Sequence, residues 1–504
     1  MNIASVIHRA ARRRPDAVAL RHGDSSLTYA ELVDAASRFA AYLRGRGVRP
    51  GDRVGVLMHN QPEWVVAMLG TWQAGACLVP YNYLFHPSAL RHATLDADVR
   101  LVVAPAVDAD RLHEALEGLE VLAEIVTVGH APGTTEWSEA LSGPADHTVE
   151  PRFDGDDAVL MYTSGSTGNP KGVRQTHRNI AAVCEATNDW WSISEEDHAL
   201  VCTPLFHVGG LQLVTLPLLV AGGTVTLRRW KVAEWLDDAV TLEPTVVALV
   251  PAMMIDIVNH LGSTPRPLPS IRVCAIGGSA LPRTRLQQLT ELTDVVAVNI
   301  YGQTEQMGLS ISEPIDEDRR EGSLGRPLAQ IVATRIAVDT PQGYRDAAVG
   351  EVGELWVRGD AVTPGYWQLP DTNAAKFVDG WFRTSDLVRA DDDGYLYYVD
   401  RADDMIISGG ENVYPQMVEG HLAACPLVAE VAVIGTRHER FSQQVTAIIV
   451  PTSPDVTAED IAAYCDNEPN LRGLQRPRRI EIVDVIPRTA TNKVDRPTLK
   501  RSFV

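Results

Sequence analysis

Residues 161–173 combine glycines with hydroxyl-bearing side chains, in the order Met-Tyr-Thr-Ser-Gly-Ser-Thr-Gly-Asn-Pro-Lys-Gly-Val. Glycines expose backbone N–H groups and hydroxyls add further donors, a combination suited to binding a polyphosphate. The apolar run from Ala158 to Tyr162 precedes this segment and predicts a buried strand that leads into the loop. We therefore expect a loop that binds the phosphates of a nucleotide.

The spacing of this loop differs from that of the NTPase P-loop, G-x-x-x-x-G-K-[ST]. Counting from Gly165, Pro170 takes the place of the second glycine, and Gly172 takes the place of the hydroxyl residue that holds magnesium. Ser, Thr, Gly, Asn and Pro are also common in solvated turns. The segment alone is compatible with a phosphate-binding loop or with a turn, so motifs elsewhere must decide.

Length and composition indicate a soluble protein of two or more domains, because 504 residues exceed a single hydrophobic core. The formal net charge of −20 disfavours binding to nucleic acid or to anionic membranes. Six cysteines without a C-x-x-C pair argue against a disulfide framework or a zinc site. We expect a cytoplasmic protein whose anionic ligands meet a few well-placed cations.

Two segments could suggest a membrane or a secretory signal, and neither fits. The N-terminal region carries Arg12, Arg13 and Arg14 without an apolar segment behind them, so it does not resemble a signal peptide. The uncharged stretch 208–227 is interrupted by Pro217 and by glycine pairs. It predicts a buried helix followed by a strand rather than an integral membrane segment.

Helices alternate with strands through the first 300 residues. Thr28 to Glu31 forms a capping box that predicts a helix to about Gly45, and a second helix is expected near Pro62 to Ala74. Strands are expected at Val54 to Met58 and Cys77 to Pro80, and the same alternation continues to about residue 300. This pattern predicts an α/β fold with mostly parallel sheets.

The pattern of predicted secondary structure changes after about Val332, where strands become shorter and are separated by Gly and Asp turns. These strands predict a small antiparallel, barrel-like sheet, and a compact α+β segment follows Arg401. We therefore expect a large N-terminal domain over residues 1–402 and a small C-terminal domain over 403–504.

Seven further motifs accompany the glycine-rich loop. In chain order they are Thr203-Pro-Leu-Phe-His-Val-Gly209, Ile276-Gly-Gly-Ser-Ala-Leu-Pro282, Asn299-Ile-Tyr-Gly-Gln-Thr-Glu305, Gly353-Glu-Leu-Trp-Val-Arg-Gly359, Trp381-Phe-Arg-Thr-Ser-Asp386, Asp400-Arg-Ala-Asp-Asp-Met-Ile-Ile-Ser-Gly-Gly-Glu-Asn412, and Arg488 to Arg496. Their types, order and spacing resemble the adenylate-forming superfamily of acyl-CoA synthetases, luciferase and peptide-synthetase adenylation domains. The resemblance covers nearly the whole chain and is strongest in type to acyl-CoA synthetases.

The resemblance implies an enzyme that joins a carboxylate to the α-phosphate of ATP, releasing pyrophosphate and forming an acyl-adenylate. Two anions about 4 Å apart repel each other by about 4 kcal/mol at an effective dielectric constant of about 20, so the site needs cations. Glu305 is similar to the Mg²⁺ ligand of the family. The phosphate loop would comprise Thr163, Ser164, Gly165, Ser166, Thr167, Gly168 and Lys171.

Adenosine recognition is also implied by the resemblance. Tyr301 would stack on adenine, Asp386 would accept hydrogen bonds from the ribose hydroxyls, and Arg401 would support the same ribose. The ATP site would be completed by Gly278, Gly302 and Thr304. Considered singly, such residues are more often turn residues or surface ion pairs, and their joint occurrence carries the argument.

Lys493 is expected to be the catalytic cation, acting together with Thr163 and Glu305. Arg488, Thr491 and Lys493 match the family pattern R-x-x-T-x-K, although Asn492 replaces its usual glycine. The lysine would counter the charge that develops as carboxylate and α-phosphate join.

The C-terminal domain is expected to be mobile. Asp403 resembles the hinge about which the family's small domain swings after adenylation. The swing would bring in Ser408, Gly409 and Gly410, which would line a tunnel for a pantetheine thiol, although two glycines alone could equally form a plain turn.

The acyl pocket is expected at residues that are mostly small or apolar, namely His207, Val208, Gly209, Met307 and Gly308. Amino-acid activators usually carry an aspartate after the position of Phe206, and this chain has none there. The substrate is therefore expected to be a hydrophobic carboxylic acid without an α-amino group.

The acceptor thiol is less defined, because residues 436–443 and 472–477 depart from the family's CoA-proximal segments. CoA is the expected acceptor, giving an acyl-CoA and AMP in fatty-acid or secondary metabolism. The alternatives are transfer to a carrier-protein phosphopantetheine or to a separate thiolation partner, and, in another class, a nucleotide-binding regulator without turnover. The sequence leaves the oligomeric state open.

Overall fold

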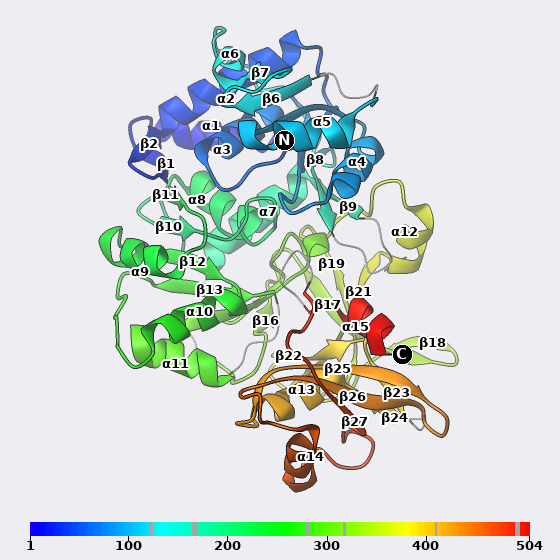
Figure 1. Cartoon of the computed structure of the whole chain (residues 1–504). Helices are drawn as coiled ribbons and strands as arrows, with labels where there is room; N and C mark the ends of the chain where they lie inside the picture. Colours follow the sequence, from blue (N-terminus) through cyan, green and yellow to red (C-terminus); the bar gives the residue numbers. More distant parts are fainter. Residues whose placement is uncertain are drawn as a thin grey trace. The chain divides into compact units, whose positions relative to one another are not determined.

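The computed structural model of the 504-residue chain describes residues 1–119, 124–163, 170–278, 283–315, 319–408, 411–488 and 494–503 (Figure 1). The chain divides into two compact units. Unit 1 comprises Met1–Ala333 and Val357–Phe382, and unit 2 comprises Thr334–Trp356 and Arg383–Val504. The domain boundary after residue 402 stays a prediction.

Unit 1 contains a seven-stranded sheet in the order β7-β6-β5-β3-β4-β8-β9. Its strands are parallel except for the antiparallel pair β8 and β9 at one edge. The strands are β3 (Arg53–Val56), β4 (Cys77–Pro80), β5 (Val99–Pro105), β6 (Glu124–Val128), β7 (Thr135–Glu136), β8 (Asp157–Thr163) and β9 (Lys171–Thr176). Its helices are α2 (Tyr29–Gly45), α3 (Pro62–Gln73), α4 (Pro87–Asp96), α5 (Ala109–Leu116) and α6 (Trp137–Ala140).

A nine-stranded sheet follows in the order β16-β15-β14-β13-β12-β10-β11-β1-β2, parallel in its middle and antiparallel at both ends. The strands are β1 (Val18–His22), β2 (Ser25–Thr28), β10 (His198–Val201), β11 (Thr224–Leu227), β12 (Val246–Leu249), β13 (Val273–Gly277), β14 (Ala297–Tyr301), β15 (Ile311–Ser312) and β16 (Arg326–Pro327). Its helices are α1 (Ala4–Arg13), α7 (His177–Trp190), α8 (Leu216–Ala221), α9 (Val232–Thr241), α10 (Pro251–Leu261) and α11 (Arg283–Thr293).

Both faces of these sheets are buried, and alternate residues of one strand enter different cores. In β12, Val246 and Ala248 belong to the core that the two sheets share, whereas Val247 and Leu249 pack with α9, α10 and α11. Figure 1 shows these three helices beside β12 and β13. This arrangement explains why the strands are continuous apolar runs, and it confirms the predicted α/β architecture.

Local signals account for the helix boundaries in unit 1. The Thr28–Glu31 capping box forms as predicted, with the Thr28 side chain accepting from the Glu31 N–H. The stretch 208–227 forms a π-helical turn over Leu211–Thr215, then α8 and β11, so the predicted helix and strand are confirmed. In the described part of the chain, no helix is long and apolar enough to cross a membrane.

A six-stranded sheet and an α+β body complete the chain. The first sheet has the order β18-β17-β19-β21-β20, with β22 paired to β21, and contains β17 (Ala333–Thr340), β18 (Gly343–Asp346), β19 (Gly353–Arg358), β20 (Phe377–Val378), β21 (Trp381–Ala390) and β22 (Leu396–Arg401). The helix α12 (Pro370–Lys376) precedes β20. The C-terminal body contains β23 (Ile406–Ser408), β24 (Glu411–Val413), α13 (Pro415–Ala423), β25 (Val428–His438), β26 (Ser442–Pro451), α14 (Ala458–Asn467), β27 (Arg479–Ile482) and α15 (Arg496–Phe503).

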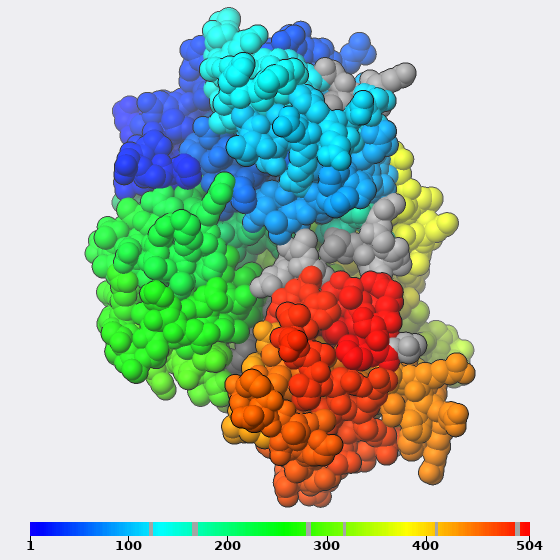
Figure 2. Space-filling view, in the orientation of Figure 1, coloured from blue at the N-terminus to red at the C-terminus, as the bar shows by residue number. Residues whose placement is uncertain are grey.

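The core of the C-terminal body lies between its sheet and its helices. Val418 and Leu422 of α13 pack with Val433 and Ile449 of β25 and β26. Leu499 of α15 joins a second apolar cluster on the same strands. Figure 2 shows the C-terminal residues in red at the surface of unit 2, which agrees with the exposure of the other side of α15. The predicted α+β body is confirmed.

Candidate active site

The glycine-rich loop leaves and re-enters one sheet at neighbouring positions. Thr163, the last residue of β8, is the antiparallel partner of Lys171, the first residue of β9. The predicted strand Ala158 to Tyr162 is confirmed within β8. The loop residues Ser164, Gly165, Ser166, Thr167 and Gly168 lie outside the described residues, as do Gly409, Gly410 and Lys493.

A segment from far along the chain, residues 363–367, lies against β9. Tyr366 and Val173 form an antiparallel bridge. The Trp367 N–H donates to the Gly172 carbonyl at 2.8 Å, and the Arg174 N–H donates to the Gly365 carbonyl at 3.1 Å. The strand that follows the phosphate loop is therefore held on a second side by this segment.

The same segment holds Glu305, which lies in a single 3-10 turn, Thr304–Gln306, after β14. The Tyr366 hydroxyl donates to Glu305 Oε1 at 2.7 Å, and the Thr363 N–H donates to the Glu305 carbonyl at 2.8 Å. On the other side, Gln175 Nε2 of β9 donates to the Thr304 carbonyl at 3.3 Å. The contacts thus bring the predicted metal ligand next to the strand that leaves the phosphate loop.

Glu305 fits a magnesium ligand by its chemistry. Mg²⁺ is usually bound by one or two carboxylates, with substrate phosphates and water completing its coordination. The part of the chain that the structure describes contains no group of three or more His, Cys, Asp or Glu residues that could form a metal cage. A single half-buried carboxylate beside the strand that follows the glycine-rich loop suits a metal that arrives with a nucleotide.

The predicted acyl residues come from two segments that meet in unit 1. Gly308 has φ +86°, and a Cβ at this position would lie 2.8 Å from Val208 Cβ. Met307 is fully buried and Val208 nearly so. His207 is half-buried, and its Nδ1 accepts from the Gly209 N–H at 3.3 Å. The close approach of residues 207–209 to Met307 and Gly308 agrees with one shared pocket wall.

Glycine is also required at position 302, where the chain passes close to the backbone of Gly308. A Cβ at Gly302 would lie 2.4 Å from the Gly308 carbonyl carbon, so no side chain fits there. Tyr301 ends β14 and is buried. Gly278 follows β13 with φ +93° in open space, a backbone conformation that L side chains rarely adopt. These positions form the ends of neighbouring parallel strands, where ligands of α/β sheets usually bind.

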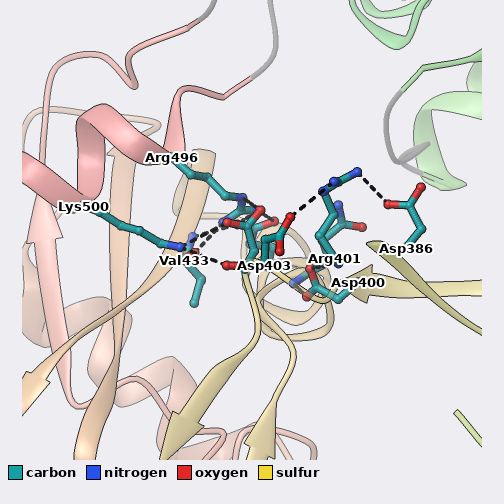
Figure 3. A network of polar contacts seen from close by, with 10 residues as sticks. Asp386, Asp400, Arg401, Asp403, Val433, Arg496 and Lys500 are labelled. Carbon is teal, nitrogen blue, oxygen red and sulfur yellow. Dashed lines mark hydrogen bonds and ion pairs between the residues drawn. The ribbon is translucent and has the colours of Figure 1, made fainter. Parts of the chain in front are cut away.

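In unit 2, Asp386 and Arg401 are cross-strand partners in β21 and β22. Arg401 Nη1 donates to Asp386 Oδ1 at 2.9 Å, and its Nη2 lies 3.7 Å from Asp403 Oδ2 (Figure 3). The Asp386 side chain is 5% exposed, whereas that of Asp403 is 71% exposed. The arginine predicted to support the ribose site thus orients the predicted ribose acceptor.

A partly buried charge network follows the predicted hinge, and we call it the Arg496 cluster: Asp404, Glu419, Arg496 and Lys500. Arg496 Nη2 contacts Glu419 Oε1 and Oε2 at 2.7 and 2.9 Å, and its Nε lies 3.5 Å from Asp404 Oδ2. Lys500 Nζ lies 3.2 Å from Asp404 Oδ1. Figure 3 shows Arg496 and Lys500 of α15 reaching toward the segment that contains Asp403. Burial raises the pKa of Glu419, while Arg496 and the Val433 N–H oppose that rise.

Asp400, at the end of β22, is hydrogen-bonded to the first turn of α13. Its carboxylate accepts from the N–H of Arg401 at 2.7 Å and from the N–H of Gln416, in the first turn of α13, at 2.8 Å. Asp400 is 1% exposed, and burial raises its pKa although both hydrogen bonds lower it. The Asp400 carboxylate therefore satisfies one orphan donor at the helix N-terminus.

The residues on either side of the undescribed segment 489–493, which contains Lys493, pair with each other. Arg488 and Val494 form an antiparallel bridge, and the Asp495 N–H donates to the Pro487 carbonyl at 2.8 Å. Arg488 Nη2 lies 2.8 Å from Glu430 Oε2. Both ends of the segment are thus fixed to β25, either through Arg488 or through Arg496, whose guanidinium donates to the Val433 carbonyl.

Sequence reasoning missed Tyr366 in unit 1, which contacts Glu305, and Arg496 in unit 2, which contacts Glu419. Tyr366 contacts a carboxylate 61 positions away, and Arg496 contacts one 77 positions away. Neither contact leaves a periodic or local pattern. The available signals were Gly365 next to a tyrosine, and an arginine three residues after Lys493.

Comparisons with known proteins identify the family and the fold. The model of the AMP-binding enzyme family matches residues 7–367, and that of the AMP-binding enzyme C-terminal domain matches residues 417–493. A feruloyl-CoA synthase of Amycolatopsis is 35% identical over 98% of both chains. A medium/long-chain fatty-acid–CoA ligase of Mycobacterium tuberculosis is 31% identical over 98% of this chain and 89% of its own. The crystal structure of ATP-bound MatB from Rhodopseudomonas palustris superimposes with a TM-score of 0.90 at 28% identity, covering 100% and 99% of the two chains.

The fold and the site thus define an adenylate-forming enzyme, and the chain belongs to the AMP-binding enzyme family. Within that family it is one of the AMP-forming acid–CoA ligases.

Proposed function

We propose that this protein activates a hydrophobic carboxylic acid without an α-amino group. The acid reacts with ATP to give an acyl-adenylate and pyrophosphate, and the acyl group then passes to CoA, releasing AMP. One observation carries the proposal: Tyr366 joins Glu305 to β9, so a carboxylate suited to Mg²⁺ lies beside the strand that leaves the phosphate loop.

The residues divide the work of adenylation by charge. Lys171 begins β9 and would meet the outer phosphates, while Lys493 would stabilise the charge that develops between the carboxylate and the α-phosphate. Mg²⁺ held by Glu305 would supply a Lewis acid that neutralises phosphate oxygens. Asp386, oriented by Arg401, would accept hydrogen bonds from the ribose hydroxyls.

The substrate class follows from the acyl wall. Val208 packs against Gly308, and Met307 lies buried beside it, so this wall offers apolar surface and no carboxylate for an ammonium group. The names of the relatives, a feruloyl-CoA synthase and a fatty-acid–CoA ligase, support CoA as the acceptor and an aromatic or aliphatic acid as the substrate. Asp403 would be the hinge, and Ser408 with the two glycines after it would line the thiol tunnel.

Pyrophosphate exchange with a panel of acids tests the proposal. We expect exchange with aryl-propenoic or medium-chain fatty acids and none with α-amino acids, followed by formation of an acyl-CoA detected by its mass. Exchange without an acyl-CoA would contradict CoA as acceptor and favour a carrier-protein phosphopantetheine or a separate partner.

Lys493→Ala tests the chemistry. Removing one preorganised charge should lower exchange by at least about a hundredfold. Lys231→Ala is the matched control, because this lysine is 65% exposed and pairs only with its helical neighbour Glu234 among described residues. Undiminished exchange in the Lys493 variant would refute the assigned role.

A further inference from the structure

We propose that Tyr366 is a positioning residue for Glu305. Through it, the 363–367 segment sets the magnesium-binding carboxylate relative to the strand that leaves the phosphate loop. This inference rests on the proposed function, because it takes Glu305 to be the metal ligand.

The hydrogen bond has the geometry of a fixed contact. Tyr366 is 7% exposed, and its hydroxyl lies 2.7 Å from Glu305 Oε1. Glu305 is half-buried, and its Oε2 makes no hydrogen bond to a described residue. The phenol therefore holds one oxygen of the carboxylate and leaves the other available for a cation.

The donor is neutral, which matters for metal binding. Among described residues, no Lys, Arg or His forms an ion pair with Glu305. An arginine in the place of Tyr366 would repel an arriving Mg²⁺, because like charges at contact distance interact strongly in a site of low effective dielectric constant. A phenol orients the carboxylate without cancelling its charge.

The backbone that carries Tyr366 is fixed by paired hydrogen bonds. The Tyr366 N–H donates to Asn373 Oδ1 at 2.8 Å, and Asn373 Nδ2 donates back to the Tyr366 carbonyl at 2.9 Å. Gly365 has φ +142°, and a Cβ there would lie 2.9 Å from Asn373 Oδ1. Glycine is therefore needed directly before the tyrosine, and the phenol is aimed by a rigid support.

The segment links two groups that must act on one nucleotide. Its backbone pairs with β9 through Val173, and its phenol holds Glu305. A shift of β9 would therefore move the metal ligand with it, so the start of β9 and the proposed metal ligand stay in register. Oriented groups of this kind gain affinity because less freedom is lost on binding.

Binding of ATP in the absence of a carboxylic acid tests the inference without turnover. The measured quantity is the Mg²⁺ concentration at which ATP binding is half-saturated, by isothermal titration calorimetry. We expect Tyr366→Phe to raise this concentration about tenfold, as for the loss of one hydrogen bond to a charged group. Tyr29→Phe is the matched control, because its fully buried hydroxyl donates to the Gly223 carbonyl at 2.8 Å in the same unit.

A double-variant cycle separates positioning from a structural role. In a Glu305→Gln background, Tyr366→Phe should change the Mg²⁺ requirement no further. Glu305→Asp, which withdraws the carboxylate from the phenol, should reproduce the shift with Tyr366 intact. It also provides an independent reading if the phenylalanine variant folds poorly.

The outcomes are distinct. If Tyr366→Phe lowers the melting temperature as Tyr29→Phe does but leaves the Mg²⁺ requirement unchanged, Tyr366 is only structural and the inference is overturned. An equal shift in the Glu305→Gln background would also overturn it, since the tyrosine would then act elsewhere. If Glu305→Gln itself leaves the Mg²⁺ requirement unchanged, the metal assignment in the proposed function fails, and the inference fails with it.

Discussion

Glu305 and Glu419 are two partly buried carboxylates that the chain holds in opposite ways. Glu305 accepts one hydrogen bond from the neutral phenol of Tyr366. Glu419 accepts two from the guanidinium of Arg496 and one from the Val433 N–H at 2.7 Å. Pairing with arginine cancels the charge of Glu419, whereas the phenol leaves the charge of Glu305 intact.

Under the proposed function, this difference separates a structural carboxylate from one that binds a metal. A buried charge without a partner is costly, so a carboxylate with only a structural role is best neutralised by a cation. A carboxylate that must attract Mg²⁺ has to keep its charge and one oxygen. Asp386 is intermediate, because an acceptor for neutral ribose hydroxyls can remain paired with Arg401.

The largest effect should come from breaking the Arg496 cluster. Arg496→Met would leave Glu419 and Asp404 without their shared partner, and breaking such a buried pair costs about 3–5 kcal/mol of unfolding free energy. Urea unfolding at pH 7 measures the change. Arg488→Met is the control, because that arginine and Glu430 are 38% and 47% exposed, and such pairs contribute less than about 1 kcal/mol. A similar decrease in the free energy of unfolding in both variants would show that the Arg496 cluster stabilises the fold no more than an exposed ion pair does.

Near the Glu305 side of unit 1, His177 is kept neutral rather than paired. It is 1% exposed at the start of α7, directly after β9, and its Nδ1 accepts from the Ile3 N–H at 3.3 Å. Burial lowers the pKa of His177 from 6.5 to about 4, and Arg152 acts in the same direction. As the pH falls, the imidazole of His177 takes up a proton in the unfolded chain before it does so in the folded chain. The contribution of neutral His177 to the free energy of unfolding is therefore fully present above pH 6.5 and is lost as the pH falls toward 4.

Lowering the pH from 7 to 4 should therefore cost about 3 kcal/mol of unfolding free energy through His177. His177→Asn keeps a neutral acceptor near the Nδ1 position and should remove this part of the pH dependence. His130→Asn is the control, because His130 is 78% exposed. Urea midpoints between pH 4 and 7 measure the slope, and an unchanged slope in the His177 variant would contradict the assignment.

The parts of the fold that sequence predicted are those with local causes. The capping box at Thr28 sets the start of α2 within a few residues of chain, and the strand Cys77–Pro80 is bounded by turn residues on both sides. The strand predicted at Val54 to Met58 corresponds to β3, Arg53–Val56; the Leu57 N–H still donates to the Val103 carbonyl of β5 at 2.9 Å, whereas Met58 lies beyond the strand and is buried. An apolar run in the sequence indicates burial. It does not show where a strand ends, because a buried connecting segment is as apolar as a buried strand.

Candidate residues could be recognised where they stand in motifs and were missed where their contacts are purely tertiary. Glu305, Asp386 and Arg401 stand in recognisable motifs, so the sequence singles them out, and their roles stay predictions. Tyr366 could not be recognised in this way, because an aromatic residue is ordinary in a core and its contact to Glu305 is purely tertiary. The same argument explains why the pairing of Arg496 with Glu419 emerges only from the fold.

The smallest predicted effect concerns Asp386, the carboxylate between the two extremes. Asp386→Asn keeps one acceptor oxygen but loses the charge that strengthens its hydrogen bonds, so the KM for ATP in pyrophosphate exchange should rise about tenfold, or about 1.4 kcal/mol. The Mg²⁺ requirement should not move, because the ribose acceptor does not hold the metal. Asp371→Asn on α12 is the control, since this residue is placed in no part of the site. An increase in the Mg²⁺ requirement would mean that the charge of Asp386 contributes to metal binding, as that of Glu305 is proposed to do. The proposed distinction between Asp386 as a ribose acceptor and Glu305 as a metal ligand would then be wrong.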